Sequence, residues 1–391
     1  MDFTNLERFM DRLTSWRIPG NAISVYKDGK EIHRYASGYS DIEKKTPFGG
    51  DDLIYIYSCS KVTTVTAMMQ LIEKGIVMIS DPVSDYIEEF KEMNIRGENG
   101  EIKKAETTMT IRHLMTMTAG LDYTLNSDEI NAALRDTNGE ADAKTIAKYI
   151  AKRPLLFEPG TFWNYSLCHD VLAGVIEAIT GMRFSEYVKK NIFEPLGIEK
   201  AYYHATPEIK EQLNPKYIYK VDDGNSNDIV AMQMKTPDGK GKIEDMGKGN
   251  SHILGKNYDS GGAGIITTVN EYAKLTGALA NGGVGTTGER ILSPGAINLL
   301  RTNQLDERAM STMTWGNLAG YGYGLGVRTL IDIAKSGSCG SIGEFGWGGA
   351  AGATVLVDPD KNIAFFYSHH MLNPQEVYYQ PRLRNAFYSC F

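Results

Sequence analysis

Two pairs of residues could supply a nucleophile and a partner for its proton, because each places a serine three positions before a lysine. They are Ser24 with Lys27 and Ser58 with Lys61. A serine hydroxyl attacks a carbonyl carbon only when a neighbouring group takes its proton, so the two side chains must lie together. About one or two such pairs are expected by chance in a chain of this length. The elements that carry each pair must therefore decide between them.

The pair Ser24 and Lys27 lies in an expected β-hairpin. An Asp-Gly turn at residues 28–29 separates two runs in which apolar and polar residues alternate, and this pattern is typical of two strands joined by a tight turn. Residues three positions apart on a strand point to opposite faces of the sheet. This pair is therefore not expected to act together.

The pair Ser58 and Lys61 lies at the start of an expected helix. Apolar residues recur every three or four positions at Val62, Val65, Met69 and Ile72, and Gly75 supplies a stop. The pattern predicts a helix that begins near Ser58 and runs for about 16 residues. Positions i and i+3 share a face of a helix, which brings Lys61 toward the serine hydroxyl. The free N–H groups of the first turn would stabilise a developing oxyanion.

Composition and charge limit the class of partner. The 391 residues include 42% apolar and 23% charged residues, which is ordinary for a soluble globular protein with two or three domains, or one fold with an inserted part. The net charge of −7 and the lack of a basic cluster disfavour a nucleic-acid or membrane-surface partner. Small molecules or peptides are the expected partners. Neither an export signal nor an apolar run of about 18 residues is present, which predicts a cytosolic protein.

Other catalytic chemistries find little support in the sequence. The four cysteines are widely spaced and form no Cys-x-x-Cys pair, which argues against a zinc knuckle or a disulfide framework. Cys59, beside Ser58, is a second candidate nucleophile, although a small buried residue is the more common role. The chain has no His-Glu-x-x-His and no Gly-x-Ser-x-Gly pattern, which disfavours a zinc hydrolase and a Ser-His-Asp triad. We expect no metal and no organic cofactor.

The remaining periodicity predicts the architecture. An amphipathic helix is expected at residues 3–16, further helices near 111 and 170–180, a second hairpin at 352–357 and 363–367, and a long loop at 222–262 that is a domain boundary or a flap.

Strands at both ends of the chain with helices between them predict an α/β fold of two subdomains. The antiparallel sheet would be built from both termini, residues 1–60 and 255–391, and flanked by helices. Residues 61–254 would form a mainly helical inserted domain, with the site at the interface.

Two later segments add to the Ser-x-x-Lys pair, one at Trp163-Asn-Tyr165-Ser-Leu167 and one glycine-rich at 345–352. With this order of motifs the chain resembles the serine β-lactamase and penicillin-binding-protein superfamily, most of all its class C β-lactamase-like carboxylesterases and related acyl transferases. Segments 79–86, 110–121 and 261–268 are similar to recurrent non-catalytic segments of that family. The resemblance covers nearly the whole chain.

The resemblance implies a role for each motif. Ser58 matches the acylated nucleophile, Lys61 the motif lysine, and Tyr165 the tyrosine that relays the proton with that lysine. Which of the two is the base stays open, because an ammonium favours a neighbouring phenolate, whereas a desolvated lysine can lose its own proton. The backbone N–H groups of Ser58 and Ala350 would form the oxyanion hole.

Two departures from the family pattern bear on the substrate. Leu167 stands where β-lactam-processing members usually have an asparagine, and Trp347-Gly348-Gly349 stands where they usually have a cation, a hydroxyl residue and a glycine. These substrate-binding positions resemble the esterase branch. An apolar wall and an indole N–H favour an uncharged acyl or alcohol group, although Trp347 could equally be a structural lid.

Three functions follow from these residues. The preferred one is a serine hydrolase that cleaves small esters or transfers their acyl group. The second is an amide-bond enzyme of the same mechanism, a β-lactamase, D-amino-acid peptidase or amidase, in which Asp170 or Glu344 would bind a free amine. The third is a catalytically silent scaffold, against which the intact trio of serine, lysine and tyrosine argues.

Overall fold

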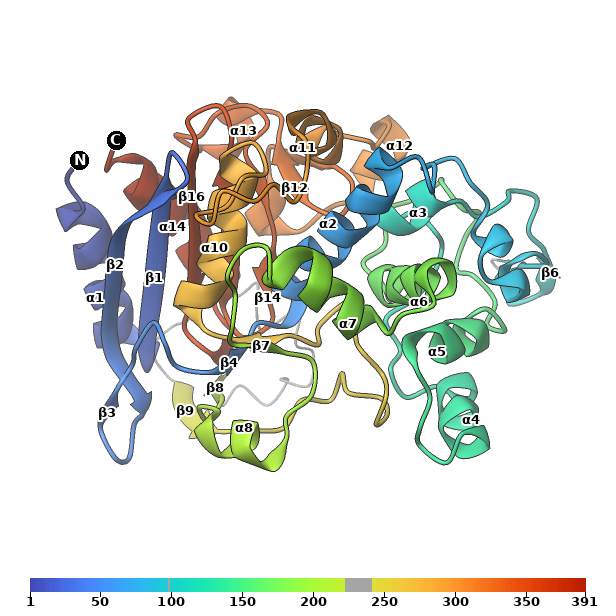
Figure 1. Ribbon diagram of the computed structural model, residues 1–391, viewed down its shortest axis with the longest axis horizontal. Helices are drawn as coiled ribbons and strands as arrows, with labels where there is room; N and C mark the ends of the chain where they lie inside the picture. Colours follow the sequence, from blue (N-terminus) through green and yellow to red (C-terminus); the bar gives the residue numbers. More distant parts are fainter. Residues whose placement is uncertain (98, 222–240) are drawn as a thin grey trace.

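The computed structural model describes residues 1–97, 99–221 and 241–391. Figure 1 shows the N- and C-terminal segments side by side at one edge of a sheet, with a helical part at the far end of the molecule. The backbone N–H of Asp2 donates to the carbonyl oxygen of Cys390 at 3.3 Å. Both ends of the chain therefore contribute to one unit, as the sequence predicts.

A nine-stranded antiparallel sheet is the centre of this unit in the described residues. Its order is β11 (Tyr321–Tyr323), β12 (Arg328–Leu330), β13 (Phe345–Gly346), β15 (Ala353–Asp358), β16 (Ile363–Ser368), β1 (Gly20–Lys27), β2 (Lys30–Asp41) and β3 (Thr46–Pro47), and β14 (Gly348–Gly349) pairs with β15.

Helices cover both faces of the central strands. Alternate residues of β1 and β16, such as Val25 and Phe365, pack against α1 (Thr4–Trp16) and α14 (Glu376–Tyr388). Their neighbours face α10 (Val269–Ala280) on the other side. Burial on both faces explains why β1, β15 and β16 are almost continuously buried.

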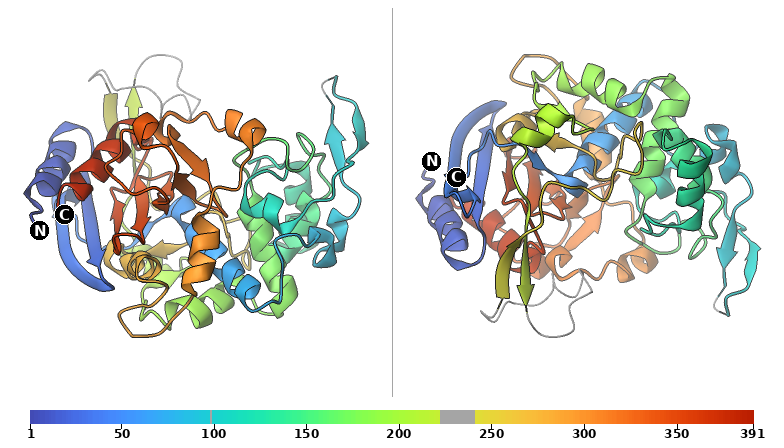
Figure 2. Two further views of the ribbon diagram at one scale, coloured as in Figure 1. Left: turned by 90° about the horizontal axis from the view of Figure 1, so that it is seen from above. Right: turned by 90° about the horizontal axis from the view of Figure 1, so that it is seen from below.

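The chain between residues 111 and 188 carries five helices, and most of this segment lies at the end of the molecule away from the termini (Figure 2). The helices are α3 (Ile111–Met115), α4 (Asp128–Asp136), α5 (Ala143–Ile150), α6 (Cys168–Thr180) and α7 (Phe184–Val188). The shorter elements are β4 (Ile54–Tyr55), β5 (Asn94–Arg96), β6 (Ile102–Lys104), β7 (Ala201–Tyr202), α8 (Pro207–Gln212), β8 (Tyr217–Val221), β9 (Gly241–Asp245), β10 (Ile266–Thr267), α11 (Pro294–Arg301), α12 (Glu307–Ser311), α13 (Ile333–Ser336) and β17 (Met371–Leu372).

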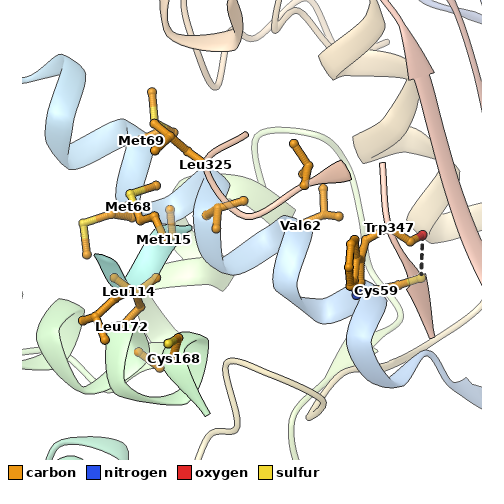
Figure 3. Close-up of a cluster of buried hydrophobic side chains, with 14 of the residues drawn as sticks. Cys59, Val62, Met68, Met69, Leu114, Met115, Cys168, Leu172, Leu325 and Trp347 are labelled. Carbon is orange, nitrogen blue, oxygen red and sulfur yellow. Dashed lines mark hydrogen bonds between the residues drawn. The ribbon is translucent and has the colours of Figure 1, made fainter. Parts of the chain in front are cut away.

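Helix α2 (Ser60–Glu73) runs through the core between the sheet and the helices. Every residue from Ser60 to Leu71 is buried. Figure 3 shows Val62, Met68 and Met69 of this helix within a cluster of apolar side chains from α3, α6 and the C-terminal part of the chain. The packing holds the start of α2 rigidly, and the candidate nucleophile lies there.

The structure confirms the α/β fold class, the N-terminal helix and both hairpins. The domain boundaries stay a prediction. The segment 61–254, predicted to form the inserted domain, is not only helical. Its strands β7 and β8 pair with β10 and β17, which lie in the C-terminal part of the chain.

The predicted loop at 222–262 is wrong at residues 241–245, which form β9 and pair antiparallel with β8. The alternation in Lys242-Ile243-Glu244 is short and is obscured by the surrounding glycines and lysines. Residues 222–240 of that loop lie outside the described residues.

Helix α14 was also not expected, because Pro381 lies within it. Among the described residues, no helix is both long and apolar enough to cross a bilayer, and the cytosolic location stays a prediction.

Candidate active site

Ser58 lies in a tight turn that leads from β4 into α2. The turn is a 3₁₀ helix, Tyr57–Cys59, so α2 itself begins two residues after the serine. Tyr57 has a φ of +45°, a left-handed conformation that is uncommon for a bulky residue and persists only where the surroundings enforce it. Burial of Tyr57 and the pairing of β4 with β10 provide that enforcement.

Lys61 is fully buried and all three of its ammonium hydrogens find acceptors. Its Nζ donates to Ser58 Oγ at 3.3 Å, to the hydroxyl of Tyr123 at 3.3 Å and to the carbonyl oxygen of Gly262 at 2.9 Å. Burial by itself lowers the pKa of Lys61, but the neighbouring Tyr123 and Tyr165 outweigh it, so the net pKa lies above its usual value. This geometry suits a lysine that stays charged.

Tyr165 makes the shortest contact with the serine. Its hydroxyl donates to Ser58 Oγ at 2.5 Å and accepts from Trp347 Nε1 at 3.4 Å. Lys61 Nζ lies 4.7 Å from the centre of the Tyr165 ring. The ring of Tyr123 stacks on the ring of Tyr165, with 5.3 Å between the two ring centroids. The structure therefore brings the three predicted side chains, serine, lysine and tyrosine, together at one point.

Asp170 of α6 holds the loop that carries one acceptor of the lysine. Its Oδ1 accepts from the hydroxyls of Tyr258 and Ser260 at 2.6 and 2.7 Å and from the N–H of Gly262 at 3.2 Å. A Cβ on Gly262 would lie 2.3 Å from Asp170 Oδ2 and 3.2 Å from Lys61 Nζ. Asp170 is thus a positioning residue behind the lysine and does not line the cavity of Ser58.

We expect Gly262→Ala to reduce turnover by at least about tenfold, because the added methyl group must displace Asp170 or Lys61. The matched control is Gly295→Ala in α11, where the nearest atom to the new methyl group is 3.8 Å away. The measurement is kcat/KM together with the thermal unfolding midpoint of both variants. Full activity in folded Gly262→Ala protein would contradict this reading of the lysine pocket.

Strand β14 brings Ala350 to the nucleophile. A Cβ on Gly349 would lie 2.2 Å from the carbonyl oxygen of Ile56, so only glycine lets this strand lie against the turn that holds Ser58. Ala350 follows directly and lines the same cavity as Ser58. Their backbone N–H groups remain the predicted oxyanion hole.

Five aromatic side chains line the cavity beside Ser58, which has a volume of about 470 Å³. They are Tyr123, Trp163, Tyr165, Trp315 and Trp347, and so include three of the four tryptophans in the chain. A second cavity of about 580 Å³ shares His252 and Ala350 with the first. Burial lowers the pKa of His252 to about 4, so this residue is neutral at pH 7.

Not every predicted binding residue reaches the cavity. Trp347 and Gly348 line it, whereas Gly349 faces the turn of Ser58. Leu167 is 1% exposed and packs in the core just before α6. The prediction that Leu167 contacts the substrate is therefore wrong.

Cys59, the second candidate nucleophile, is fully buried. Its Sγ donates to the carbonyl oxygen of Trp347 at 3.6 Å (Figure 3), and burial raises the pKa of its thiol. It is therefore an unreactive residue.

Sequence reasoning missed several residues of the cavity wall, among them Tyr123, His252, Trp315 and Glu376. They come from separate loops and from the start of α14, and no motif marks them. The proposed amine ligand Glu344 is instead buried, where its Oε1 accepts from Arg328 at 2.5 Å. In the described part of the chain, no cluster of His, Cys, Asp and Glu is arranged to hold a metal ion.

Comparison with known proteins shows which family the chain belongs to. A family model described as Beta-lactamase matches residues 5–387. The chain belongs to this family. Esterase EstB of Burkholderia gladioli is 26% identical over 90% of this chain and 85% of its own length. Acyltransferase calJ of Penicillium decumbens is 24% identical over 87% of this chain and 81% of its own.

A solved structure of the same fold is EstCE1, described as a hydrolase with promiscuous acyltransferase activity. It superposes with a TM-score of 0.76 at 24% identity and covers 98% of this chain and 97% of its own. The family and the curated relatives support a serine hydrolase of the esterase and acyltransferase kind.

Proposed function

We propose that the protein is a serine hydrolase that acts on small carboxylic esters through an acyl intermediate on Ser58, by hydrolysis or by transfer to an alcohol. The observation that carries this proposal is the position of Ser58 Oγ, 2.5 Å from the hydroxyl of Tyr165 and 3.3 Å from Lys61 Nζ. Ser58 and Tyr165 both line a cavity large enough for a small substrate, and Lys61 lies buried behind them.

The first half of the reaction forms the acyl intermediate. Ser58 Oγ attacks the carbonyl carbon while its proton passes to the oxygen of Tyr165, which acts as a phenolate, and the charge of Lys61 together with the indole N–H of Trp347 stabilises that phenolate before it takes the proton. The carbonyl oxygen becomes an oxyanion between the N–H groups of Ser58 and Ala350. When the intermediate collapses, the bond to the leaving alcohol breaks and the proton on Tyr165 transfers to it.

The second half releases the acyl group. Water or an acceptor alcohol gives its proton to Tyr165 and attacks the acyl carbon. The bond between the acyl carbon and Ser58 Oγ then breaks, and Tyr165 returns the proton to the serine. The two cavities that meet at His252 and Ala350 give separate spaces for an acyl group and for an alcohol. This division supports transfer as well as hydrolysis.

An ester suits the walls of the cavity better than a β-lactam. The segment Trp347-Gly348-Gly349 offers no cation or hydroxyl for a lactam carboxylate. The esterase and acyltransferase relatives agree with this preference. One observation favours the amide-bond alternative, the carboxylate of Glu376 in the cavity wall.

The test compares p-nitrophenyl butyrate, a chromogenic cephalosporin and an amino-acid p-nitroanilide as substrates of the purified protein. We expect kcat/KM for the ester to exceed the other two by about 100-fold or more, since only the ester combines a reactive carbonyl with an apolar acyl group. Faster cleavage of the cephalosporin or the anilide would replace the ester proposal by the amide-bond function. No turnover of any of them, with no acyl adduct, would favour a silent scaffold.

A further inference from the structure

Glu376 is an acidic residue in the wall of the Ser58 cavity that the proposed reaction does not use. It lies in the first turn of α14. Its Oε1 is 3.0 Å, and Gln380 Nε2 is 2.8 Å, from the point that a Cβ on Gly348 would occupy, so the carboxylate lies close against the strand that leads to Ala350. The carboxylate accepts a long hydrogen bond of 3.4 Å from Gln380 Nε2.

No positively charged side chain among the described residues forms an ion pair with the carboxylate of Glu376. Within the described residues, no lysine, arginine or histidine nitrogen comes within 4.0 Å of its carboxylate. Arg328 also lines the cavity, but its charge is compensated by Glu344. Arg384, two turns further along α14, lies 5.0 Å over the ring of Tyr321. Burial raises the pKa of Glu376 to about 7 although Arg384 opposes the shift.

Aromatic rings surround the same space. The ring centroids of Trp315 and Trp347 are 6.1 Å apart, those of Trp163 and Trp315 are 5.4 Å apart, and Tyr165 lies 5.1 Å from Trp315. Faces of aromatic rings attract cations, and the attraction is strongest where water is excluded. A carboxylate without a close cation beside several such rings is the chemistry that recognises an ammonium group.

We propose that this cavity binds a cationic amine carried by the substrate, with Glu376 as its counter-ion and the tryptophans as its walls. The inference deepens the proposed function and rests on it for turnover. The preferred substrates are then small esters that carry an ammonium group in the acyl or the alcohol part. The sequence favoured an uncharged group at Trp347, and the carboxylate of Glu376, which no motif marks, is the reason for proposing a cationic one instead.

The kinetic test compares acetylcholine with 3,3-dimethylbutyl acetate, which has the same shape but a carbon in place of the charged nitrogen. Acid release gives kcat/KM for both. We expect the charged ester to be preferred at least about tenfold, and the preference to fall to about threefold or less in Glu376→Gln protein. The control is Glu208→Gln on the exposed helix α8, which should keep the preference.

A binding test does not depend on turnover. Tryptophan fluorescence of the Ser58→Ala protein is titrated with choline, with ethanolamine and with neutral 3,3-dimethyl-1-butanol. We expect saturable changes with choline or ethanolamine at concentrations at least about tenfold below those that the neutral alcohol needs, and loss of this difference in the Ser58→Ala, Glu376→Gln double variant. The two amines distinguish a quaternary from a primary ammonium site.

The outcomes separate the two proposals. Turnover of the neutral ester without preference for the charged one, and equal binding of choline and the neutral alcohol, would overturn the cation site and leave the esterase intact. Preferential binding of an amine, with no hydrolysis of these two esters or of p-nitrophenyl butyrate, would overturn the esterase and support the cation site. Thermal unfolding of each variant shows whether the substitution leaves the protein folded.

Discussion

Replacing Ser58 by alanine is expected to lower kcat/KM on p-nitrophenyl butyrate by at least about 10⁴-fold, because among the described residues its hydroxyl is the one that contacts both Tyr165 and Lys61. The neighbouring Cys59 cannot take over the reaction, since its thiol is fully buried and points to the carbonyl oxygen of Trp347. The measurement is steady-state kinetics of both proteins at equal concentration, with circular dichroism to show that the variant is folded.

Ser24→Ala is the matched control. Ser24 is also buried and also precedes a lysine by three positions, but it lies on β1, and its hydroxyl donates to Glu31 at 2.7 Å. The loss of that hydrogen bond is expected to cost about 1 kcal/mol of stability and to leave turnover unchanged. Residual activity of more than about one per cent in Ser58→Ala, or a comparable loss in Ser24→Ala, would contradict the assignment of the nucleophile.

Replacing Tyr165 by phenylalanine is expected to lower kcat by about 100-fold or more, because the serine then loses the oxygen that takes its proton at 2.5 Å. Tyr123→Phe is the comparison, since its hydroxyl also accepts from Lys61 but makes no hydrogen bond with Ser58. We expect a loss of about tenfold or less there.

The ranking of the two tyrosine variants is what decides the identity of the base. A larger loss in Tyr123→Phe than in Tyr165→Phe would transfer the role of proton acceptor away from Tyr165. Equal activity of Tyr165→Phe and the unchanged protein would leave Lys61 as the base, which its three hydrogen bonds and its raised pKa disfavour.

Local sequence was enough to predict that the candidate nucleophile Ser58 and Lys61 lie together. Both lie within one helical turn, where the spacing of the side chains follows from helix geometry, and the hairpin geometry separates Ser24 from Lys27. Tyr165, Trp347 and Ala350 are distant along the chain, so only the resemblance to a family indicated their role. The structure brings them to Ser58 through β14 and the segment before α6.

The remaining cavity residues depend on tertiary packing. Glu376, Trp315 and Tyr123 reach the cavity because α14 and two loops pack around it, and their sequence neighbours show no pattern. Leu167 failed as a predicted contact for a local reason. It is the N-cap residue of α6, and the chain turns there from the segment of Tyr165 into a helix whose first three turns are buried in the core. The tyrosine therefore faces the cavity and the leucine faces the core.

The central claim is that Ser58 carries the acyl group, and mass spectrometry of the modified protein tests it most directly. The protein is mixed with p-nitrophenyl butyrate, quenched with acid within the first turnovers and digested. We predict a butyryl group on the peptide that contains Ser58, assigned to that residue by fragmentation, and its absence in Ser58→Ala protein. Acylation of another residue during full turnover, with Ser58 unmodified, would contradict the mechanism proposed for this site.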